Sequence, residues 1–412
     1  MKSSTLYIYF FIVIFFVDCF FGFTWIMFST IANYFLLIVL IFSKNIKFKF
    51  NKIYLPFLLF LLYIFLINIL QNDILDAISL LIPFIPLPLI FYSLYESNNN
   101  NRIIYNYSKT WLLLNFVFCI FQFFDFHIIL SDVSSLFPFV GKVYDFDSNI
   151  EDQGLRVSGI TYSIIGFSSH LGMIFFYFFY NRNNMYSKKM RLIYLLILIF
   201  LIFMTQTRSL IFLIAPILFI NSFLFSNKSF ATKTRYLLIL IPLIFGLTFL
   251  FAGYLQVTFP RLFLSLESDG SIVHRLQANV FASIGTFYTS PIIGIPFDDA
   301  LKMMNYGYSK IGLFVGEYFI DEVTHHNQPS FYFRYYGFIG LIFLIFIYFK
   351  MIKIAISSKN SETKKIILSI VIFHFLYTQS HNNTIFTDYF LWIFLSLRSP
   401  SFNYKTKFNG TK

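Results

Sequence analysis

The sequence predicts an all-α, polytopic integral membrane protein with about twelve transmembrane helices and one large loop on the outer face. Three observations support this fold class. The 412 residues are 58% hydrophobic and only 12% charged, which leaves little polar side-chain surface for a soluble globule. Apolar runs of about 17–25 residues recur along the chain, and each is long enough to cross a hydrocarbon core about 30 Å thick. Basic residues collect in alternate connections between these runs, which is the pattern that orients helices in a membrane.

The predicted helices follow the apolar runs in chain order and form a single membrane domain over residues 1–412. They cover residues 6–21, 25–43, 54–70, 74–95, 110–130, 159–180, 192–206, 209–226, 236–256, 335–350, 366–380 and 384–398. The first run resembles a signal peptide, but Asp18 interrupts it and no small-residue cleavage site follows, so we predict an uncleaved span. Cys19 and Cys119 both lie in apolar runs, which excludes a disulfide framework and a CxxC site.

The basic residues predict the orientation of the chain. With the N-terminus inside, 23 of the 31 Lys and Arg residues fall in the inside segments. These segments lie around residues 2, 44–52, 102–109, 182–191, 228–235, 350–365 and 398–412. The positive-inside rule therefore places both termini in the cytoplasm. The net charge of +12 is a topology signal and indicates no nucleic-acid partner, because the basic residues are scattered over short loops and form no single face.

Two connections on the predicted outer side are much longer than the others. The smaller covers residues 131–158 and the larger covers residues 257–334. Long connections in a compact protein are usually functional or disordered. Within the larger one, Leu276, Val280, Phe281 and Ile284 predict a short amphipathic helix at the membrane interface. The sequence from Ser290 to Gly294 predicts a turn. We therefore expect the chemistry on the outer face.

Four arginines stand in prominent positions on that face. They are Arg156 in Gly-Leu-Arg-Val-Ser-Gly, Arg208 in Thr-Gln-Thr-Arg-Ser, Arg275 after His274, and Arg334 after the His-His-Asn run. The guanidinium group is always charged, and its planar fork matches a phosphate with two hydrogen bonds. Arginines that converge on one cavity at the membrane boundary suit a lipid-linked pyrophosphate. The alternative is that each one snorkels to the interface or pairs with a loop acid such as Glu151 or Asp152.

The adjacent histidines His325 and His326 allow three interpretations. An imidazole has an ordinary pKa of about 6.5 and suits a general base. Glu322 lies three and four residues before the two histidines, so a metal site on one helix face is a second possibility. The third is a structural role in capping the tenth helix. No second ligand cluster with familiar spacing occurs, so we predict neither a metal nor another cofactor.

Several single polar residues lie in or close to the predicted spans. They are Asp18, Asp125, His127, His170 and Asp388, and the eleventh span carries His374. An ionisable group at membrane depth is costly and usually functional, so each of these is a candidate site residue.

The segment that begins at His326 resembles part of a known family. His326-Asn327 and, after nine intervening residues, Gly337-Phe338-Ile339-Gly340 are similar to the His-Asn…Gly-x-x-Gly element of the O-antigen polymerase (Wzy-type) and O-antigen ligase superfamily of bacterial membrane glycosyltransferases. Three further elements of that superfamily have counterparts in this sequence. They are a Ser/Thr-Arg turn at Arg208, an Arg-x-x-Gly element at Arg156 and Gly159, and a loop arginine with a Pro-x-x-Gly turn at Arg275, Pro291 and Gly294. The matches cover roughly residues 150–345.

The resemblance implies a glycosyltransferase fold of the membrane-embedded C type, in a bacterial inner membrane. The substrate would be an undecaprenyl pyrophosphate-linked oligosaccharide at the periplasmic face, and the reaction an inverting, metal-independent displacement. His326 would be the base for the acceptor hydroxyl, and Arg208 and Arg275 would stabilise the departing pyrophosphate. The expected substrate-binding residues are Arg156, His325, Asn327 and Arg334. Membrane lipid and a chain-length-regulating co-polymerase are the further partners that the resemblance implies.

Three functions fit this sequence. The first is a polymerase that joins lipid-linked repeat units of an O-antigen or capsule. The second is a ligase that moves the finished glycan onto lipid A-core, because the His-Asn…Gly element is common to both enzymes. The third belongs to a different class and is a flippase or another twelve-span carrier. Carriers often have two similar halves, and this sequence has none.

Overall fold

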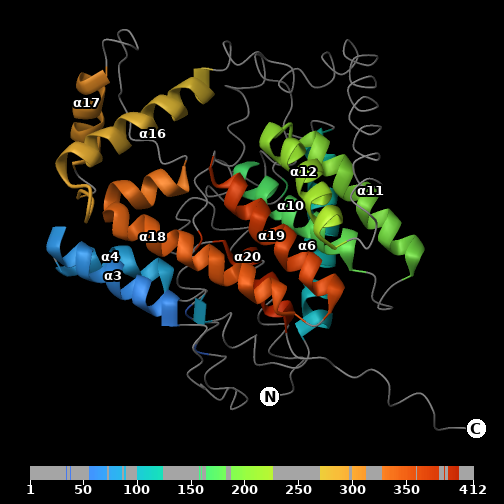
Figure 1. Cartoon of the computed structure of the whole chain (residues 1–412). Helices are drawn as coiled ribbons and strands as arrows, with labels where there is room; N and C mark the ends of the chain where they lie inside the picture. The colour runs from blue at the N-terminus through green and yellow to red at the C-terminus, as the bar shows by residue number, and fades with distance from the viewer. Residues whose placement is uncertain are drawn as a thin grey trace, which may run out of the picture.

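The computed structural model describes slightly more than half of the chain in separate stretches. Apart from single positions, the described residues are 55–71, 74–85, 88–89, 100–123, 164–181, 187–225, 270–296, 299–311, 327–358, 360–379 and 388–398. The described residues form helices and turns and contain no strand (Figure 1). The predicted spans 6–21, 25–43 and 236–256 and the loop 131–158 lie outside these stretches. The described part is therefore all-helical, as the sequence predicts.

Two of the described helices are long and apolar enough to cross a membrane. They are α12 (Arg208–Phe225) and α18 (Gln328–Ile356). A third apolar helix, α3 (Leu55–Gln71), is slightly shorter. The part of α18 that follows Gly337 exposes Phe338, Ile342, Ile345 and Phe349 along one face. These positions recur every three to four residues, so they form a continuous apolar stripe that suits contact with lipid.

Several predicted spans coincide with observed helices within a few residues. Besides α3 and α12 these are α10 (Ile164–Tyr180), α11 (Lys188–Met204) and α19 (Ser361–Tyr377), which match the predictions 159–180, 192–206 and 366–380. The helix α10 packs against both α11 and α19. Its side chains from Leu171 to Phe178 are all buried, so it is a central helix of the described core.

Three predicted spans differ from the structure. The span 74–95 is not one continuous helix, because α4 (Ile74–Leu81) gives way to a 3-10 turn at Ile82–Phe84. Pro83 lacks the N–H group that an α-helix needs at this point. The span 110–130 is α6 (Asn100–Phe123), which begins ten residues earlier than predicted. In the last span, the described residues 388–398 form the short α20 (Tyr389–Leu395) and the 3-10 turn η4 (Ser396–Arg398).

The large outer segment contains a helical hairpin. Its helices are α16 (Gly270–Thr289), which includes the predicted amphipathic helix, and α17 (Ala300–Ile311). The two helices approach closely at Gly285 and Gly307. A Cβ atom on Gly307 would lie 1.9 Å from the carbonyl oxygen of Phe281, so only glycine fits there. Figure 1 shows α16 above the first part of α18.

The helix α18 breaks at Gly337 and folds back on itself. Gly337 has φ 62° and ψ −163°, which no helical residue adopts. As a result, the Tyr348 hydroxyl donates to Oε1 of Gln328 at 2.8 Å. In a straight helix these residues would be separated by about 30 Å. The helix predicted over 335–350 therefore begins seven residues earlier than predicted: a short arm, 328–336, precedes the break, and a long arm, 338–356, follows it.

The predicted Pro-x-x-Gly turn fills the break in α18. The Phe338 N–H donates to the Pro291 carbonyl at 2.8 Å, and the Ile295 N–H donates to the Arg334 carbonyl at 2.8 Å. Gly294, with φ 79°, lies so close that its Cβ would be 2.3 Å from the Tyr335 carbonyl carbon. The turn therefore satisfies backbone groups that the helix can no longer pair internally.

The helix α3 supports the same region from the other side. The Tyr63 hydroxyl donates to the Tyr336 carbonyl at 2.7 Å, and the Gln71 amide donates to the Ile293 carbonyl at 3.2 Å. The first bond binds α3 to the carbonyl just before the break, and the second binds it to the turn. Three segments that are far apart in sequence thus meet at Gly337.

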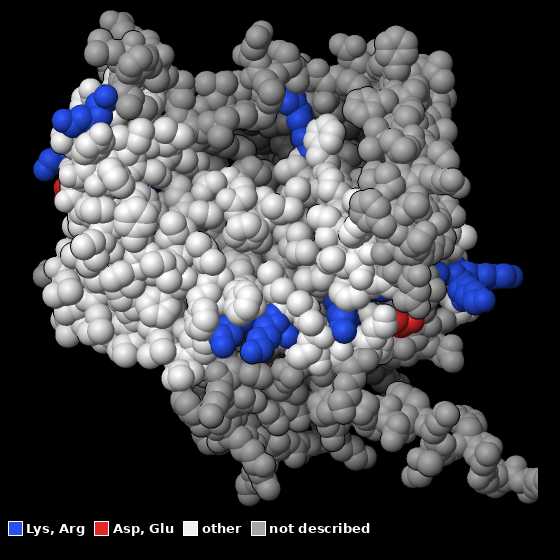
Figure 2. Space-filling model, in the orientation of Figure 1, with Lys and Arg blue, Asp and Glu red and all other residues white. Residues whose placement is uncertain are grey.

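Basic side chains lie at the opposite end of α18 from this junction. They include Lys350 and Lys353 near its C-terminus and Lys364 and Lys365 near the start of α19. Figure 2 shows basic side chains along the lower and right edges of one face and others at the upper left and top centre, with an uncharged surface between the two sets. The predicted inside segment 350–365 is therefore separated from the Gly337 junction by the length of the long arm.

We expect Gly337→Ala to destabilise the protein strongly. The new Cβ would lie 2.1 Å from the Ile292 carbonyl oxygen, and the residue would have to keep a positive φ. The combined cost is about 3 kcal/mol. The thermal midpoint of the purified protein in detergent measures it. Ile342→Ala, on the exposed face of the same arm, is the control and should change the midpoint little. Equal midpoints for Gly337→Ala and wild type would contradict the described junction.

Candidate functional site

The structure describes only some of the residues that the sequence predicts for the site. Asn327, Arg334 and Arg208 are described with their side chains. The backbone of Arg275 lies in α16, but its side chain is outside the described part. Arg156, His325 and His326 lie outside the described residues as well. The arrangement of the elements that carry these residues can nevertheless be followed through their immediate neighbours.

Asn327 is the N-cap of α18. Its Oδ1 accepts from the Ser330 N–H at 2.8 Å, and its Nδ2 donates to the Gln379 carbonyl at 2.8 Å. The amide therefore starts the short arm of α18 and ties it to the C-terminal end of α19. The capping role considered for the two histidines is performed by Asn327, the residue that follows them in the sequence.

The residues before Arg208 form a tight buried turn between α11 and α12. Gln206 has φ 48°, and Thr205 and Thr207 are buried beside it. The Thr207 hydroxyl lies 2.8 Å from the Ser168 hydroxyl of α10. Arg208 itself is the first residue of α12 and is partly exposed. The turn thus fixes a solvent-accessible arginine at the end of two packed helices.

The segment that follows Arg156 lies against the same turn. The Val157 N–H donates to the Met204 carbonyl at 3.3 Å, just before Thr205. Gly159, with φ 60°, then passes so close to α6 that a Cβ would be 2.0 Å from Oδ1 of Asn115. The Arg-x-x-Gly element and the Ser/Thr-Arg turn, about 50 residues apart in sequence, are therefore neighbours in space.

Arg334 lies deeper than the sequence predicts. Instead of ending an outer loop, it belongs to the short arm of α18, and its side chain is fully buried. Its guanidinium carbon lies 5.7 Å from the ring centre of Tyr335. A buried guanidinium is retained only where its charge is compensated. This position makes Arg334 part of the packed wall near the Gly337 junction.

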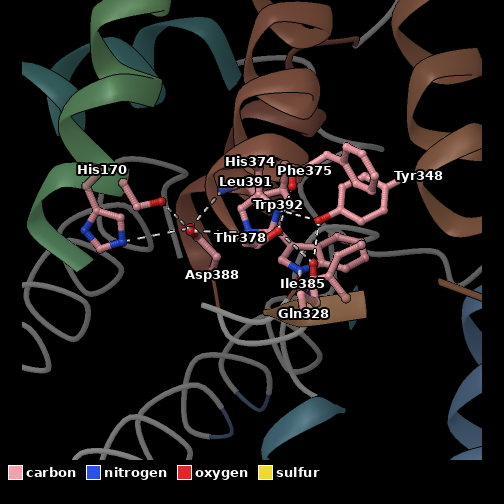
Figure 3. A network of polar contacts seen from close by, with 11 residues as sticks. His170, Gln328, Tyr348, His374, Phe375, Thr378, Ile385, Asp388, Leu391 and Trp392 are labelled. Carbon is pink, nitrogen blue, oxygen red and sulfur yellow. Dashed lines mark hydrogen bonds and ion pairs between the residues drawn. The ribbon is translucent and has the colours of Figure 1, made fainter. Parts of the chain in front are cut away.

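A buried polar cluster connects α10, α19 and α20 around Asp388 (Figure 3). The Ser169 hydroxyl donates to Asp388 Oδ2 at 3.1 Å. His170 Nε2 lies 3.8 Å from Oδ1 and His374 Nε2 lies 3.6 Å from Oδ2, so the carboxylate stands between two imidazoles. Oδ1 also caps α20 by accepting from the Leu391 N–H at 3.4 Å.

The cluster continues from His374 to the first residue of α18. His374 Nδ1 lies 2.7 Å from the Tyr348 hydroxyl, which contacts Gln328 Oε1. The Thr378 hydroxyl lies 3.1 Å from the same oxygen, and the Gln328 N–H donates to the Thr378 carbonyl at 2.9 Å. Gln328 directly follows Asn327, so the cluster ends next to the His-His-Asn run.

The hydrogen bonds around His374 limit the protonation states that its ring can adopt. If Tyr348 donates its one hydrogen to Gln328 Oε1, then His374 Nδ1 must be the donor to Tyr348. The oxygen and nitrogen of the Gln328 side-chain amide can also be assigned the other way round. Nε2, which has no acceptor among the described residues in its present position, then donates to Tyr348, and Tyr348 donates to His374 Nδ1. The second arrangement leaves His374 neutral, with the Tyr348 hydroxyl as the donor to Nδ1. In both arrangements Nε2 carries a proton directed toward Asp388, because a bare Nε2 would face a carboxylate.

Together these contacts form a polar path between the two predicted parts of the site, with one step along the α10 backbone from Ser168 to Ser169. The path runs from Thr207 through the adjacent Ser168 and Ser169 to Asp388, and from there through His374 and Tyr348 to Gln328. Tyr348 lies about 16 Å along the long arm of α18 from Gly337. The path therefore crosses the packed core at roughly the middle of that arm.

The sequence indicated only part of this cluster. His170, His374 and Asp388 stood out as ionisable groups in apolar runs, but Tyr348 is one of 28 tyrosines and carried no signal. Ser168 and Ser169 were visible as polar residues before His170, without a partner to identify. Among the described residues no group of three or more His, Cys, Asp or Glu is arranged to hold a metal ion.

No protein-family model matches the sequence, and no curated protein matches it. The family resemblance therefore rests on the motifs, and the geometry adds the positions of the elements that carry them.

We expect Asp388→Ala to destabilise the protein by about 3 kcal/mol, because it removes the α20 cap and leaves Ser169 and His374 without their acceptor. Asp388→Asn is the matched variant. It retains an oxygen for the cap but presents fewer acceptor sites, so it should lose about half as much. Thermal unfolding in detergent measures both. If alanine proved as stable as aspartate, the cluster would not be holding these helices together.

Proposed function

We propose that this protein is a membrane glycosyltransferase that polymerises undecaprenyl pyrophosphate-linked oligosaccharide repeat units at the periplasmic face of a bacterial inner membrane. The proposal includes about twelve spans, cytoplasmic termini and a C-type glycosyltransferase fold. The reaction is inferred from the motif resemblance. The packing of the elements that carry the motifs supports it.

The observation that carries the proposal is the convergence of separate motifs. The Pro-x-x-Gly turn fills the break at Gly337, the Arg-x-x-Gly element lies on the Ser/Thr-Arg turn, and the path through Asp388 connects that turn to Gln328. Motif matches that arose by chance would not be expected to lie beside one another in the structure. Their pairing supports the interpretation that they form one site, with Arg208 and the His-His-Asn run at its two ends.

The proposed site provides what a pyrophosphate donor requires. The acceptor hydroxyl oxygen attacks the anomeric carbon, the bond from that carbon to the pyrophosphate oxygen breaks, and undecaprenyl pyrophosphate leaves. Arg208, with Arg275 and Arg156, stabilises the charge that develops on the leaving group. His326 accepts the proton of the attacking hydroxyl and later releases it to solvent. The reaction inverts the anomeric configuration.

We expect His326→Ala and Arg208→Ala each to lower the polymerisation rate by about 100-fold or more at equal expression. Purified protein in proteoliposomes, supplied with lipid-linked repeat units, measures the rate directly. Arg208→Lys should recover only part of the activity, since the charge remains but the planar fork is lost. Arg191→Ala, at the other end of α11, is the matched arginine control and should retain full activity. His325→Ala tests which imidazole acts. Unchanged rates in both alanine variants would refute the assigned roles.

Deleting the gene distinguishes a polymerase from a ligase. Loss of the polymerase should leave single repeat units on lipid A-core, whereas loss of a ligase should leave lipid A-core without any repeat unit. Gel electrophoresis of lipopolysaccharide from the deletion strain shows the difference. Complementation with the wild-type gene must restore the ladder of chain lengths. A bare lipid A-core would favour the ligase.

One observation favours a carrier as the second candidate. The helix α18 is broken, and its short arm returns to the level of Tyr348 on the long arm, as discontinuous helices do in many transporters. A proteoliposome assay with repeat units already on the outward-facing side separates the two functions. A polymerase extends them, whereas a carrier leaves their length unchanged.

A further inference from the structure

The outer surface of α16 carries an apolar stripe that the proposed reaction does not use. Val280, Ile284, Phe287 and Tyr288 are four, seven and eight residues apart, so they share one face of the helix. Val280, Phe287 and Tyr288 are 48%, 54% and 61% exposed. A contiguous surface of this kind on a helix facing water would be unfavourable and usually marks a contact site.

The opposite face of α16 is already occupied by protein. Phe281, Ala282 and Thr286 are buried, and Gly285 touches the backbone of α17 at Met303. The Ser283 hydroxyl lies 2.9 Å from the Ser330 hydroxyl of α18. The helix is thus packed on two helices of this chain, which fixes the direction in which its apolar stripe points. The amphipathic helix predicted from the sequence exists, but Phe281 belongs to its buried face.

The stripe continues onto the apolar face of α18. The rings of Phe287 and Phe338 lie 6.3 Å apart, and Ile292 in the connecting turn is 61% exposed. Phe338 begins the exposed row that continues through Ile342 and Ile345 along the long arm. A surface that covers the side of a membrane-spanning helix and then extends along α16 follows the boundary of a lipid layer.

The neighbouring helix α17 has the polar groups that belong at such a boundary. Lys310 lies 4.9 Å from the ring centre of Tyr306 and 5.9 Å from that of Tyr288. Lys302, Asn305 and Ser309 are exposed on the same helix. Aromatic rings and lysines with apolar stems concentrate at headgroup level, where one part of the side chain is buried and the other is hydrated.

We propose that the stripe on α16 rests on the outer leaflet of the membrane, with α17 above it among the lipid headgroups. The partner is the phospholipid surface itself. The contact lies at the end of α18 that is remote from Lys350 and Lys353, as the positive-inside rule requires of an outer surface. Because the turn that fills the Gly337 break directly follows α16, lipid would hold the hairpin in the position from which the turn enters the break. The contact does not depend on which reaction the protein catalyses.

Spin labels on the full-length protein in phospholipid nanodiscs test this contact. With the native cysteines replaced (Cys19→Ser, Cys119→Ala), labels at Val280→Cys and Phe287→Cys report the stripe, and labels at Lys302→Cys and Ser309→Cys on α17 are the controls. We expect the ratio of oxygen to water-soluble nickel accessibility to be severalfold higher at the stripe than on α17.

Two results would overturn the proposal. If nickel reaches Val280→Cys and Phe287→Cys as readily as the controls, the stripe faces water. If neither oxygen nor nickel reaches them, protein covers the stripe, either another segment of the chain or a second copy. Should the labelled variants fail to fold, Phe287→Trp in lipids with brominated acyl chains replaces them. Its fluorescence should be quenched and that of Ser309→Trp should not, and equal quenching would contradict the contact.

Discussion

The break in α18 at Gly337 is the constraint on which the rest of the site depends. An interrupted helix in an apolar environment leaves backbone donors and acceptors that water cannot satisfy, so protein groups must replace the missing bonds. The turn from Pro291 to Gly294 and the hydroxyl of Tyr63 provide them. In return, the break lets the short arm fold back, which brings Gln328 to Tyr348. A continuous helix would have carried the His-His-Asn run away from the polar cluster.

The cluster around Asp388 is the second feature that holds these elements together. Its hydroxyls and imidazoles come from α10, α18 and α19 and meet a carboxylate that also caps α20. A buried carboxylate without such partners would cost several kcal/mol, so the helices are held in one arrangement by the need to satisfy it. The same arrangement places the Arg208 turn and the start of α18 at the two ends of one polar path. Stability and the geometry of the proposed site therefore have a common origin.

The limits of the described helices were predicted best where an apolar run is bounded by polar residues. The limits of α3 and α12 follow from such runs, and the Ser290–Gly294 turn follows from its proline and glycine. The prediction from the sequence failed where tertiary contacts override the local pattern. Residues 328–334 look like the end of a loop, yet Asn327 caps a helix there. The fold-back at Gly337 depends on a turn that lies 43 to 46 residues earlier in the chain, which no local pattern reveals. Tyr348 joined the cluster only because of that fold-back.

A structure of the protein with its leaving lipid tests the central proposal most directly, namely that Arg208 binds the pyrophosphate of the departing lipid. Cryo-electron microscopy of the full-length protein in nanodiscs with undecaprenyl pyrophosphate would locate the two phosphates. We expect their density beside the Arg208 guanidinium, at the α11–α12 turn. Density at the basic end of α18, near Lys350 and Lys353, with none at Arg208, would contradict the claim.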